Sequence, residues 1–296
     1  MLRVGYVPEH FASPLLQYAD VDQGKTFVLS SFPGGTGAMI AALQNNEIDV
    51  AVALTDALIA GIANGSQAYK LVGSYVSTSL NWAVVTGKDS KYQSIDDLRG
   101  SKLGISRAGS GSQTMARLIE QQSSWVDRLG KRWNNKRVPL GMVKFEPVRD
   151  ARSSLTNPIQ RFTTKPHVDA GEARFIGSVP TPWPSWLIAA HPSSERADPG
   201  ALRNFLGQLT EYVIHFDDEK QREKADVDFI RERFGYQESD VREWLKTVHW
   251  VEECGAIPGK VIADTLSILD KTGVVKRPAN GFVVEEFVNT GVVRLV

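Results

Sequence analysis

The sequence contains little cysteine, no excess of charge of either sign and no long apolar run. Its 296 residues include one cysteine, Cys254, which cannot form an internal disulfide and is expected to be a small buried side chain. Lys and Arg together number 34, as do Asp and Glu, so the formal net charge is zero. Because phosphate neutralisation needs clustered basic residues, this balance predicts no nucleic-acid partner. No stretch approaches the roughly 18 apolar residues of a membrane span, so none is predicted.

Several motifs of catalysis and nucleotide binding are also missing. The five histidines lie at no spacing that binds a metal ion, and we predict neither a metal nor a cofactor. No G-x-S-x-G nucleophile motif occurs. The stretch "FPGGTGAM" lacks the lysine of a P-loop, and Ile40 stands where a dinucleotide-binding turn has its third glycine. These absences favour a binding protein over an enzyme without deciding between them.

The amino terminus shows no export signal. Met1 is followed at once by the apolar, β-rich run "LRVGYVP", without a basic n-region, an apolar h-region or a cleavage site. If Met1 is the native start, we expect the chain to be cytoplasmic.

Strand and helix patterns alternate over the first 85 residues. "LRVGYVP", "KTFVLSSF" and "IDVAVAL" are typical of strands, and the last is continuously apolar, as in a parallel sheet buried on both faces. "GTGAMIAALQNNE" and "DALIAGIANG" have helical periodicity. This alternation predicts a doubly wound α/β lobe.

A second lobe is predicted to begin near "SIDDLRGSKLGIS", where Ser94 and Asp97 have the spacing of a capping box. "RAGSGSQTMARLIEQQ" then repeats the glycine-rich turn and helix of the first lobe. We expect an α/β fold of two doubly wound lobes, joined by two crossing hinge strands near 80–86 and 183–190. The predicted boundaries are 1–83 for the first part of lobe one, 84–184 for lobe two, and 185–296 for a return strand and C-terminal helices that complete lobe one.

The second lobe is expected to be short by one βα unit. Only about a dozen residues separate Val148 from "RFTT", and Pro158 interrupts them. A helix and a buried strand like those of the first lobe do not fit in this space. The sequence therefore predicts a missing strand and a damaged pocket wall, through a deletion or an imperfect gene model.

Polar residues and glycines follow the predicted strands, at the sheet edge where open α/β folds bind ligands. Glu9 and His10 follow the first strand; His10 is expected to donate to an anion or to titrate near neutral pH, and Glu9 to bind an amine or orient His10. Glycines at a helix start expose amides that favour negative charge, with hydroxyls at Thr36 and Ser112. Thr55 and Asp56 end the third strand. Asp56 could instead cap the next helix, and each turn could be an ordinary connection.

Three stretches together resemble the type 2 periplasmic-binding-protein superfamily: "LRVGYVPEHFASPLL", "GGTGAMIAALQNNEIDVAVALTDALIAGIANG" and "SIDDLRGSKLGISRAGSGSQTMARLI". The branch it resembles contains aliphatic-sulfonate, taurine and nitrate binding proteins and the fungal thiamine-pyrimidine synthases. "TPWPSW" and "RFTTKP" are similar to signal-less fungal proteins with that fold and no established ligand. The resemblance implies two hinged lobes closing on a small molecule. Carried over by position, the pocket residues would be Glu9, His10, Gly35, Thr36, Gly37, Thr55, Asp56, Asn81, Ser110, Ser112 and Gln113.

The predicted function is binding of a small anionic or zwitterionic ligand, such as a sulfonate, a carboxylate or a pyrimidine-like compound. One alternative is a divergent thiamine-pyrimidine-synthase-like enzyme, although the cysteine cluster that the resemblance implies for those synthases has no counterpart here. Another is a regulatory protein with a vestigial pocket. The sequence predicts no particular oligomeric state.

Overall fold

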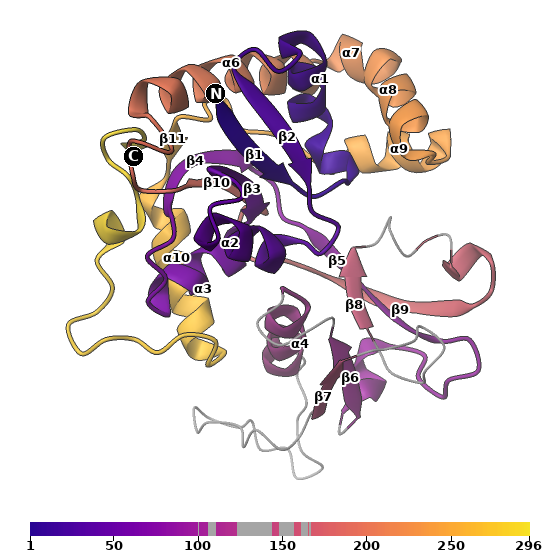
Figure 1. The fold of residues 1–296 in the computed structure, drawn as a ribbon. Coiled ribbons are helices and arrows are strands. Elements are labelled where there is room, and N and C mark those ends of the chain that lie inside the picture. The colour runs from indigo at the N-terminus through magenta and orange to yellow at the C-terminus, as the bar shows by residue number, and fades with distance from the viewer. Residues whose placement is uncertain (100, 106–110, 123–143, 148–156, 161–164, 166) are drawn as a thin grey trace. The chain divides into compact units, whose positions relative to one another are not determined.

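The chain folds into two compact α/β units. The computed structural model describes residues 1–99, 101–105, 111–122, 144–147, 157–160, 165 and 167–296. Unit 1 comprises Met1–Ser79 and Pro182–Val296, and unit 2 comprises Leu80–Thr181 (Figure 1). Unit 2 is thus inserted in the chain between the two parts of unit 1.

Unit 1 is built on a five-stranded mixed sheet with the order β2-β1-β3-β10-β4. Strand β1 pairs in parallel with both β2 and β3, whereas β10 is antiparallel to β3 and to β4. Every residue of β10 is buried, because this strand from the second half of the chain occupies an inner position in the sheet. The strands are β1 (Leu2–Tyr6), β2 (Phe27–Ser31), β3 (Val50–Leu54), β4 (Lys70–Val76) and β10 (Trp186–Ala190).

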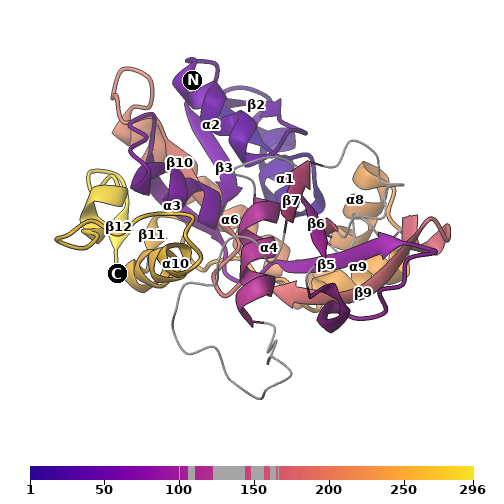
Figure 2. The ribbon, with the colours of Figure 1, turned by 90° about the horizontal axis from the view of Figure 1, so that it is seen from below.

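Two helical layers cover the faces of this sheet. On one face α3 and α10 lie side by side in both views, next to α2 (Figures 1 and 2). Their buried side chains, Leu58 and Leu266 among them, form one core cluster with the strands. On the other face Tyr18 of α1 stacks on Phe205 of α6 at 5.9 Å between ring centroids, and both rings contact Phe27 of β2. Burying one large apolar side chain stabilises a fold by about 1.5–3 kcal/mol. The helices of the two layers are α1 (Ser13–Asp22), α2 (Thr36–Gln44), α3 (Thr55–Ala63), α6 (Pro199–Asp217) and α10 (Gly259–Lys271).

The long charged run after α6 forms separate short helices rather than one. Asp218 lies between α6 and α7, and its carboxylate caps the start of α7 by accepting a hydrogen bond from the amide of Lys220 at 3.0 Å. Lys224 then leaves the helical conformation, with φ −146°, and separates α7 from α8. The remaining elements of unit 1 are η1 (His10–Ala12), α7 (Glu219–Glu223), α8 (Ala225–Phe234), α9 (Glu238–Leu245), β11 (Ala256–Ile257), η3 (Val284–Phe287) and β12 (Arg294–Leu295).

The motif "NNEIDVAVAL" includes a buried carboxylate, Asp49, that is ion-paired with arginine. Asp49 is buried and accepts hydrogen bonds from the amide, Nε and Nη2 of Arg3 at 3.0, 3.0 and 2.6 Å. Arg196, which follows β10, donates to the carbonyl of Ile48 at 2.6 Å. Hydrogen bonds from Arg3 are the main reason that the pKa of Asp49 lies below its usual range despite burial. The hydrogen bonds of Arg3 and Arg196 connect β1, the start of β3 and the segment after β10, so this part of the motif has a structural role.

Unit 2 contains five strands among its described residues. Strand β5 is antiparallel to β8 on one side and to β9 on the other, and β6 forms a parallel pair with β7. Strand β6 also lies against β8, and α4 packs on both. The predicted capping box is confirmed, since the carboxylate of Asp97 accepts from the amide of Ser94 at 2.9 Å. The elements are β5 (Asn81–Gly87), η2 (Ile95–Leu98), β6 (Lys102–Ile105), α4 (Gly111–Gln122), β7 (Lys144–Pro147), β8 (Asn157–Gln160) and β9 (Ala173–Pro180).

The strand predicted to be missing from the second lobe is present. Strand β8 pairs with β5, with Pro158 opposite Val84, so the described strands number five in unit 2 as in the main sheet of unit 1. The sequence obscured this strand because it spans four residues, contains a proline and has no apolar alternation. The segment between β7 and β8 is short, residues 148–156 against 32–49 between β2 and β3, and its conformation lies outside the described residues.

The two chain segments that join the units are paired with each other at both ends. In unit 2 the amide of Leu80 donates to Oγ1 of Thr181 at 3.0 Å, and the amide of Thr181 donates back to the carbonyl of Leu80 at 2.9 Å. In unit 1 the amide and hydroxyl of Ser185 both donate to the carbonyl of Thr78, at 3.0 and 2.8 Å. The chain therefore passes between the units at 79–80 and 181–182. The predicted strand at 80–86 lies in unit 2, where it pairs with β8 and β9, and the one at 183–190 lies in unit 1, where β10 pairs with β3 and β4.

Candidate functional site

The predicted ligand residues of unit 1 lie at one edge of its sheet. Because β1, β2 and β3 are parallel and adjacent, their carboxyl ends share this edge. Glu9 and His10 follow β1, the turn 35–37 follows β2, and Thr55 and Asp56 follow β3. The topology thus brings together three segments that are far apart in the sequence.

The glycine turn positions the start of α2 against the end of β3. Gly35 precedes the helix with φ 71°, a conformation that favours glycine. Thr36 is buried, and its hydroxyl oxygen accepts a hydrogen bond from the amide of Leu54 at 3.1 Å. Within the part of the chain that the structure describes, the amides of Thr36 and Gly37 have no backbone acceptor. These amides lie at the positive end of the helix dipole, which favours an anionic or carbonyl oxygen.

Thr55 and Asp56 form the first turn of α3. The amide of Thr55 donates to the carbonyl of Ser185 at 3.1 Å, and its side chain is 0% exposed. Oγ1 of Thr55 has no hydrogen-bond partner among the described residues, which is unusual for a buried hydroxyl. Asp56 is buried one position further along. The interpretation of Asp56 as a helix cap is wrong, because the residue preceding the helix is Leu54 and no side chain caps it.

His10 is enclosed by aromatic rings and is only 2% exposed. Its ring centroid lies 4.8 Å from that of Phe11 and 4.4 Å from that of Trp244. Nδ1 of His10 lies 3.3 Å from the hydroxyl of Tyr236, which follows α8. Burial lowers the pKa of His10 to about 3. The expectation that His10 titrates near neutral pH is therefore wrong, and only a neutral hydrogen-bonding role is open to it.

Tyr236 and Trp244 contact this edge although sequence reasoning did not include them. They follow His10 by more than 200 residues in the sequence and belong to the α8–α9 hairpin, residues 225–245. Glu9 is half-buried, and its negative charge adds to burial in raising the pKa of Tyr236 to about 12. No spacing or periodicity in the sequence connects these residues, because only tertiary packing brings the hairpin to the first loop.

The predicted residues of unit 2 are placed as follows. Asn81 is the first residue of β5 and is exposed. Ser112 and Gln113 belong to the first turn of α4, where Ser112 is buried and Gln113 half-buried. Ser110 lies outside the described residues. The start of β5 thus carries Asn81, and the start of α4 carries Ser112 and Gln113.

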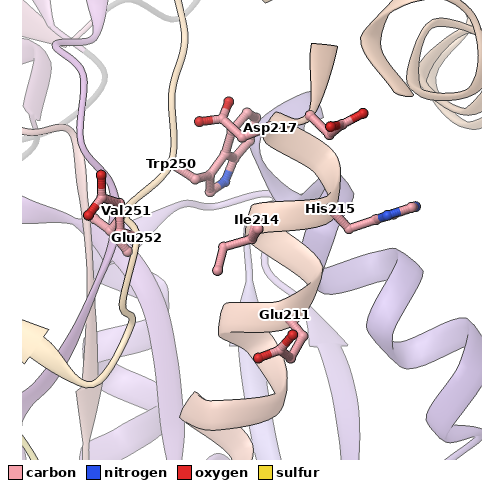
Figure 3. A pocket seen from close by; sticks show the side chains of 8 residues that line it. Glu211, Ile214, His215, Asp217, Trp250, Val251 and Glu252 are labelled. Atoms are coloured by element: carbon pink, nitrogen blue, oxygen red, sulfur yellow. The ribbon is translucent and has the colours of Figure 1, made fainter. Parts of the chain in front are cut away.

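A hollow of about 580 Å³ lies elsewhere on unit 1, between the C-terminal half of α6 and residues 250–252 (Figure 3). Asp217 in its wall is already ion-paired with Arg222 and lies 3.3 Å from Nδ1 of His249. None of the predicted ligand residues lines this hollow. Its wall consists of Glu211, Ile214, His215, Asp217, Asp218, Trp250, Val251 and Glu252.

Metal centres and membrane spans are two further classes of feature that the described residues do not form. Among the described residues no group of three or more His, Cys, Asp or Glu could hold a metal ion. Within the same residues, no helix has the length and apolar character needed to cross a membrane. Cys254 is confirmed as a buried side chain, and burial raises the pKa of its thiol to about 12.

Comparisons with known proteins agree with this architecture. Residues 82–179 match the family model described as Ca3427-like PBP, and residues 29–128 match the model described as NMT1/THI5 like. A search of curated proteins finds no match.

Solved structures share the fold over nearly the whole chain. The Candida albicans CA3427 gene product, described as having the generic periplasmic binding protein fold, is 26% identical with a TM-score of 0.83, covering 100% of this chain and 97% of that one. The alkanesulfonate-binding protein SsuA from Xanthomonas axonopodis pv. citri, bound to MOPS, is 14% identical with a TM-score of 0.71 and covers 96% of each chain. The nitrate-binding protein NrtA from Synechocystis PCC 6803 is 12% identical with a TM-score of 0.69, covering 98% and 86%.

Proposed function

Because this chain belongs to the type 2 periplasmic-binding-protein superfamily, we propose that it binds a small anionic or zwitterionic molecule at the carboxyl edge of the unit 1 sheet. The observation that carries the proposal is the buried hydroxyl of Thr55, which has no partner among the described residues and stands at the start of α3. The amides of Thr36 and Gly37 at the start of α2 add two more donors at the same edge. Donors without charge suit an oxygen-rich group such as a sulfonate or a carboxylate.

The names of two structural relatives are consistent with this ligand class. One is an alkanesulfonate-binding protein bound to MOPS, and another is a nitrate-binding protein. Both names refer to small anions with several oxygen atoms. Pyrimidine-like compounds stay among the candidates because of the sequence resemblance to the thiamine-pyrimidine synthases.

Thermal shift measurements test the proposal directly. We expect a sulfonate, a carboxylate or a pyrimidine compound in the panel to raise the unfolding temperature, since a ligand at 100 times its Kd stabilises the folded state by about 2.7 kcal/mol. Failure of every member of a broad panel to shift the transition would count against a binding function.

The variant Thr55→Val tests the location of the site. It keeps the shape of the side chain and removes the hydroxyl. Loss of one hydrogen bond, at about 0.5–1.5 kcal/mol, is expected to weaken binding by roughly 2- to 12-fold. The matched control is Thr265→Val in α10, because Thr265 is also fully buried and its hydroxyl also has no partner among the described residues. Equal affinities in both variants would place the ligand elsewhere.

We further propose that the two units close on the ligand. The support is that the chain passes between the units at two neighbouring places, bonded through Leu80 with Thr181 and Thr78 with Ser185, and domain closure uses a few such connecting residues as hinges. Solution X-ray scattering should then show a smaller radius of gyration in the presence of a ligand from the panel. An unchanged radius at saturation would contradict closure.

An enzymatic role can be tested by assaying turnover with the same preparations of the protein. Turnover that depends on iron and pyridoxal phosphate would indicate a thiamine-pyrimidine-synthase-like activity. Cys254 does not support it, because a fully buried thiol with a raised pKa is a poor metal ligand or nucleophile.

A further inference from the structure

The turn between α8 and α9 places a phenol against the imidazole of His10. The Tyr236 hydroxyl lies 3.3 Å from Nδ1 of His10, and the two ring planes meet at 85° with centroids 5.2 Å apart. An edge-on arrangement at this distance directs the hydroxyl to the ring nitrogen rather than to the ring face. Of the two nitrogens, it is Nδ1 that Tyr236 engages.

The surroundings of His10 exclude its charged form around neutral pH. Phe11 lies against the ring at an interplanar angle of 32°, and Trp244 meets it edge-on at 89°. Apolar rings cannot solvate an imidazolium, and this desolvation is the cause of the lowered pKa. A neutral imidazole has one nitrogen that donates and one that accepts.

The direction of the hydrogen bond decides which nitrogen carries the proton. Burial and the charge of Glu9 keep the Tyr236 phenol protonated, with a pKa of about 12. Among the described residues, the one hydrogen-bond partner of this hydroxyl is Nδ1 of His10. A protonated phenol can donate or accept, but its proton needs an acceptor, and this need is met when the phenol donates to Nδ1 and the imidazole proton resides on Nε2.

We propose that Tyr236 is a positioning residue of the ligand site, which holds His10 as a neutral donor through Nε2–H. Resting on the proposed function, this deepens it: His10 would present a hydrogen to an oxygen acceptor of the ligand, and would contribute no positive charge. Discrimination for anions would then come from the helix starts at Thr36 and Thr55. We expect the contribution of His10 to ligand affinity to be independent of pH from 5 to 8.

The tautomer is measurable on the 296-residue chain without a ligand. In two-bond ¹⁵N–¹H correlation spectra of the protein labelled at histidine nitrogen, we expect His10 to show a protonated Nε2 and an unprotonated Nδ1, unchanged from pH 5 to 8. Loss of one set of signals in His10→Gln assigns the residue among the five histidines. A protonated Nδ1, or titration within this range, would overturn the proposal.

The variant Tyr236→Phe removes the hydroxyl and keeps the ring. We expect the His10 signals to move to values averaged between the two tautomers. The matched control is Tyr212→Phe, because Tyr212 belongs to the same unit but stacks on Tyr18 at 4.9 Å, outside the rings around His10. Unaltered His10 signals in Tyr236→Phe would show that Tyr236 does not set the tautomer. The wild-type spectrum decides the assignment even if this variant does not fold.

A binding measurement separates this inference from the proposed function. Taurine, methanesulfonate and acetate serve as probes in calorimetric titration. If a probe binds wild-type protein, Tyr236→Phe should weaken it several-fold and Tyr212→Phe should not; equal affinities would overturn the positioning role. If no probe and no other panel member binds while the tautomer is as expected, the ligand function fails, and with it the role of His10 as a ligand donor.

Discussion

At the scale of single residues, burial decides the charge of several groups in this protein. Burial lowers the pKa of His10 and raises that of Asp226, in each case toward the neutral form, whereas the pKa of the buried Asp49 is lowered because Arg3 donates to it repeatedly. Asp226 has one donor, Nε2 of Gln17, at 3.1 Å from Oδ1, and its Oδ2 has no partner among the described residues. Burial raises the pKa of both carboxylates, and the number of hydrogen-bond donors around each determines whether the net shift is upward or downward.

Asp226 provides a prediction about stability and pH. Burial raises its pKa to about 6, above the value of about 3.9 in an unfolded chain. The folded state then binds more protons than the unfolded state between these values, so stability falls as the pH rises from 4 to above 6. At about 1.4 kcal/mol per pKa unit, the loss is up to about 3 kcal/mol. His215 and Arg222 lower this pKa and Asp218 raises it, so these three groups modulate the transition.

The variant Asp226→Asn should abolish this part of the pH dependence. A neutral amide can also donate to Oε1 of Gln17, a second buried atom with no partner among the described residues. Urea unfolding at pH 5 and pH 8 should therefore differ less in the variant than in the wild type. Asp228→Asn in the same helix is the control, because Asp228 is accessible and its pKa is lowered mainly by Lys224. An identical pH dependence in wild type and Asp226→Asn would refute the assignment.

At the scale of elements, the strands and helices of unit 1 were largely predictable, and those in the middle of the chain were not. Residues 36–44 form a helix where the apolar periodicity of "GTGAMIAALQNNE" predicts one. Strand β8 was missed, and the local sequence does not show that Lys224 divides the charged run after α6 into α7 and α8. Short elements carry few periodic positions, and their existence depends on neighbours such as β5 that the local sequence does not specify.

Two glycines in secondary structure should respond to substitution in opposite ways. A Cβ on Gly73 of β4 would lie 2.5 Å from the carbonyl oxygen of Cys254 and 2.9 Å from Leu206. Gly73→Ala is therefore expected to destabilise the protein by about 1–3 kcal/mol through overpacking. Gly207 of α6 is exposed with no atom within 4 Å of the new Cβ, so Gly207→Ala should stabilise the helix by up to about 1 kcal/mol. Chemical denaturation of both variants checks the pair; a stable Gly73→Ala would show that β4 can shift.

At the scale of the whole molecule, the chain passes between the two units only at 79–80 and 181–182. The two connecting segments are hydrogen-bonded to each other. Oγ1 of Thr181 accepts from the amide of Leu80, and the hydroxyl of Ser185 donates to the carbonyl of Thr78. The return of the chain to the first lobe was predictable because a strand pattern reappears near residue 186. The bonds between the crossings were not, since they join residues about 100 positions apart.

Thr181→Val tests how far this pairing holds the junction together. The variant removes the acceptor of the Leu80 amide, and a buried donor left without a partner costs about 1–3 kcal/mol. We expect faster hydrogen exchange at the Leu80 amide, while the amide of Thr55 in unit 1, bonded to Ser185, exchanges as before. Uniformly faster exchange would indicate global destabilisation, and no change at Leu80 would mean that another group replaces the hydroxyl.

The sequence by itself determined the α/β alternation, the glycine turn before α2 and the placing of Glu9, His10, Thr55 and Asp56 after strands. These features depend on interactions between residues close in the chain, which periodicity and turn chemistry record. Tertiary structure alone decided that β10 enters antiparallel between β3 and β4, and that the α8–α9 hairpin brings Tyr236 and Trp244 to His10. It also decided that His10 is neutral, because the state of a titratable group depends on desolvation by side chains at any distance in the sequence.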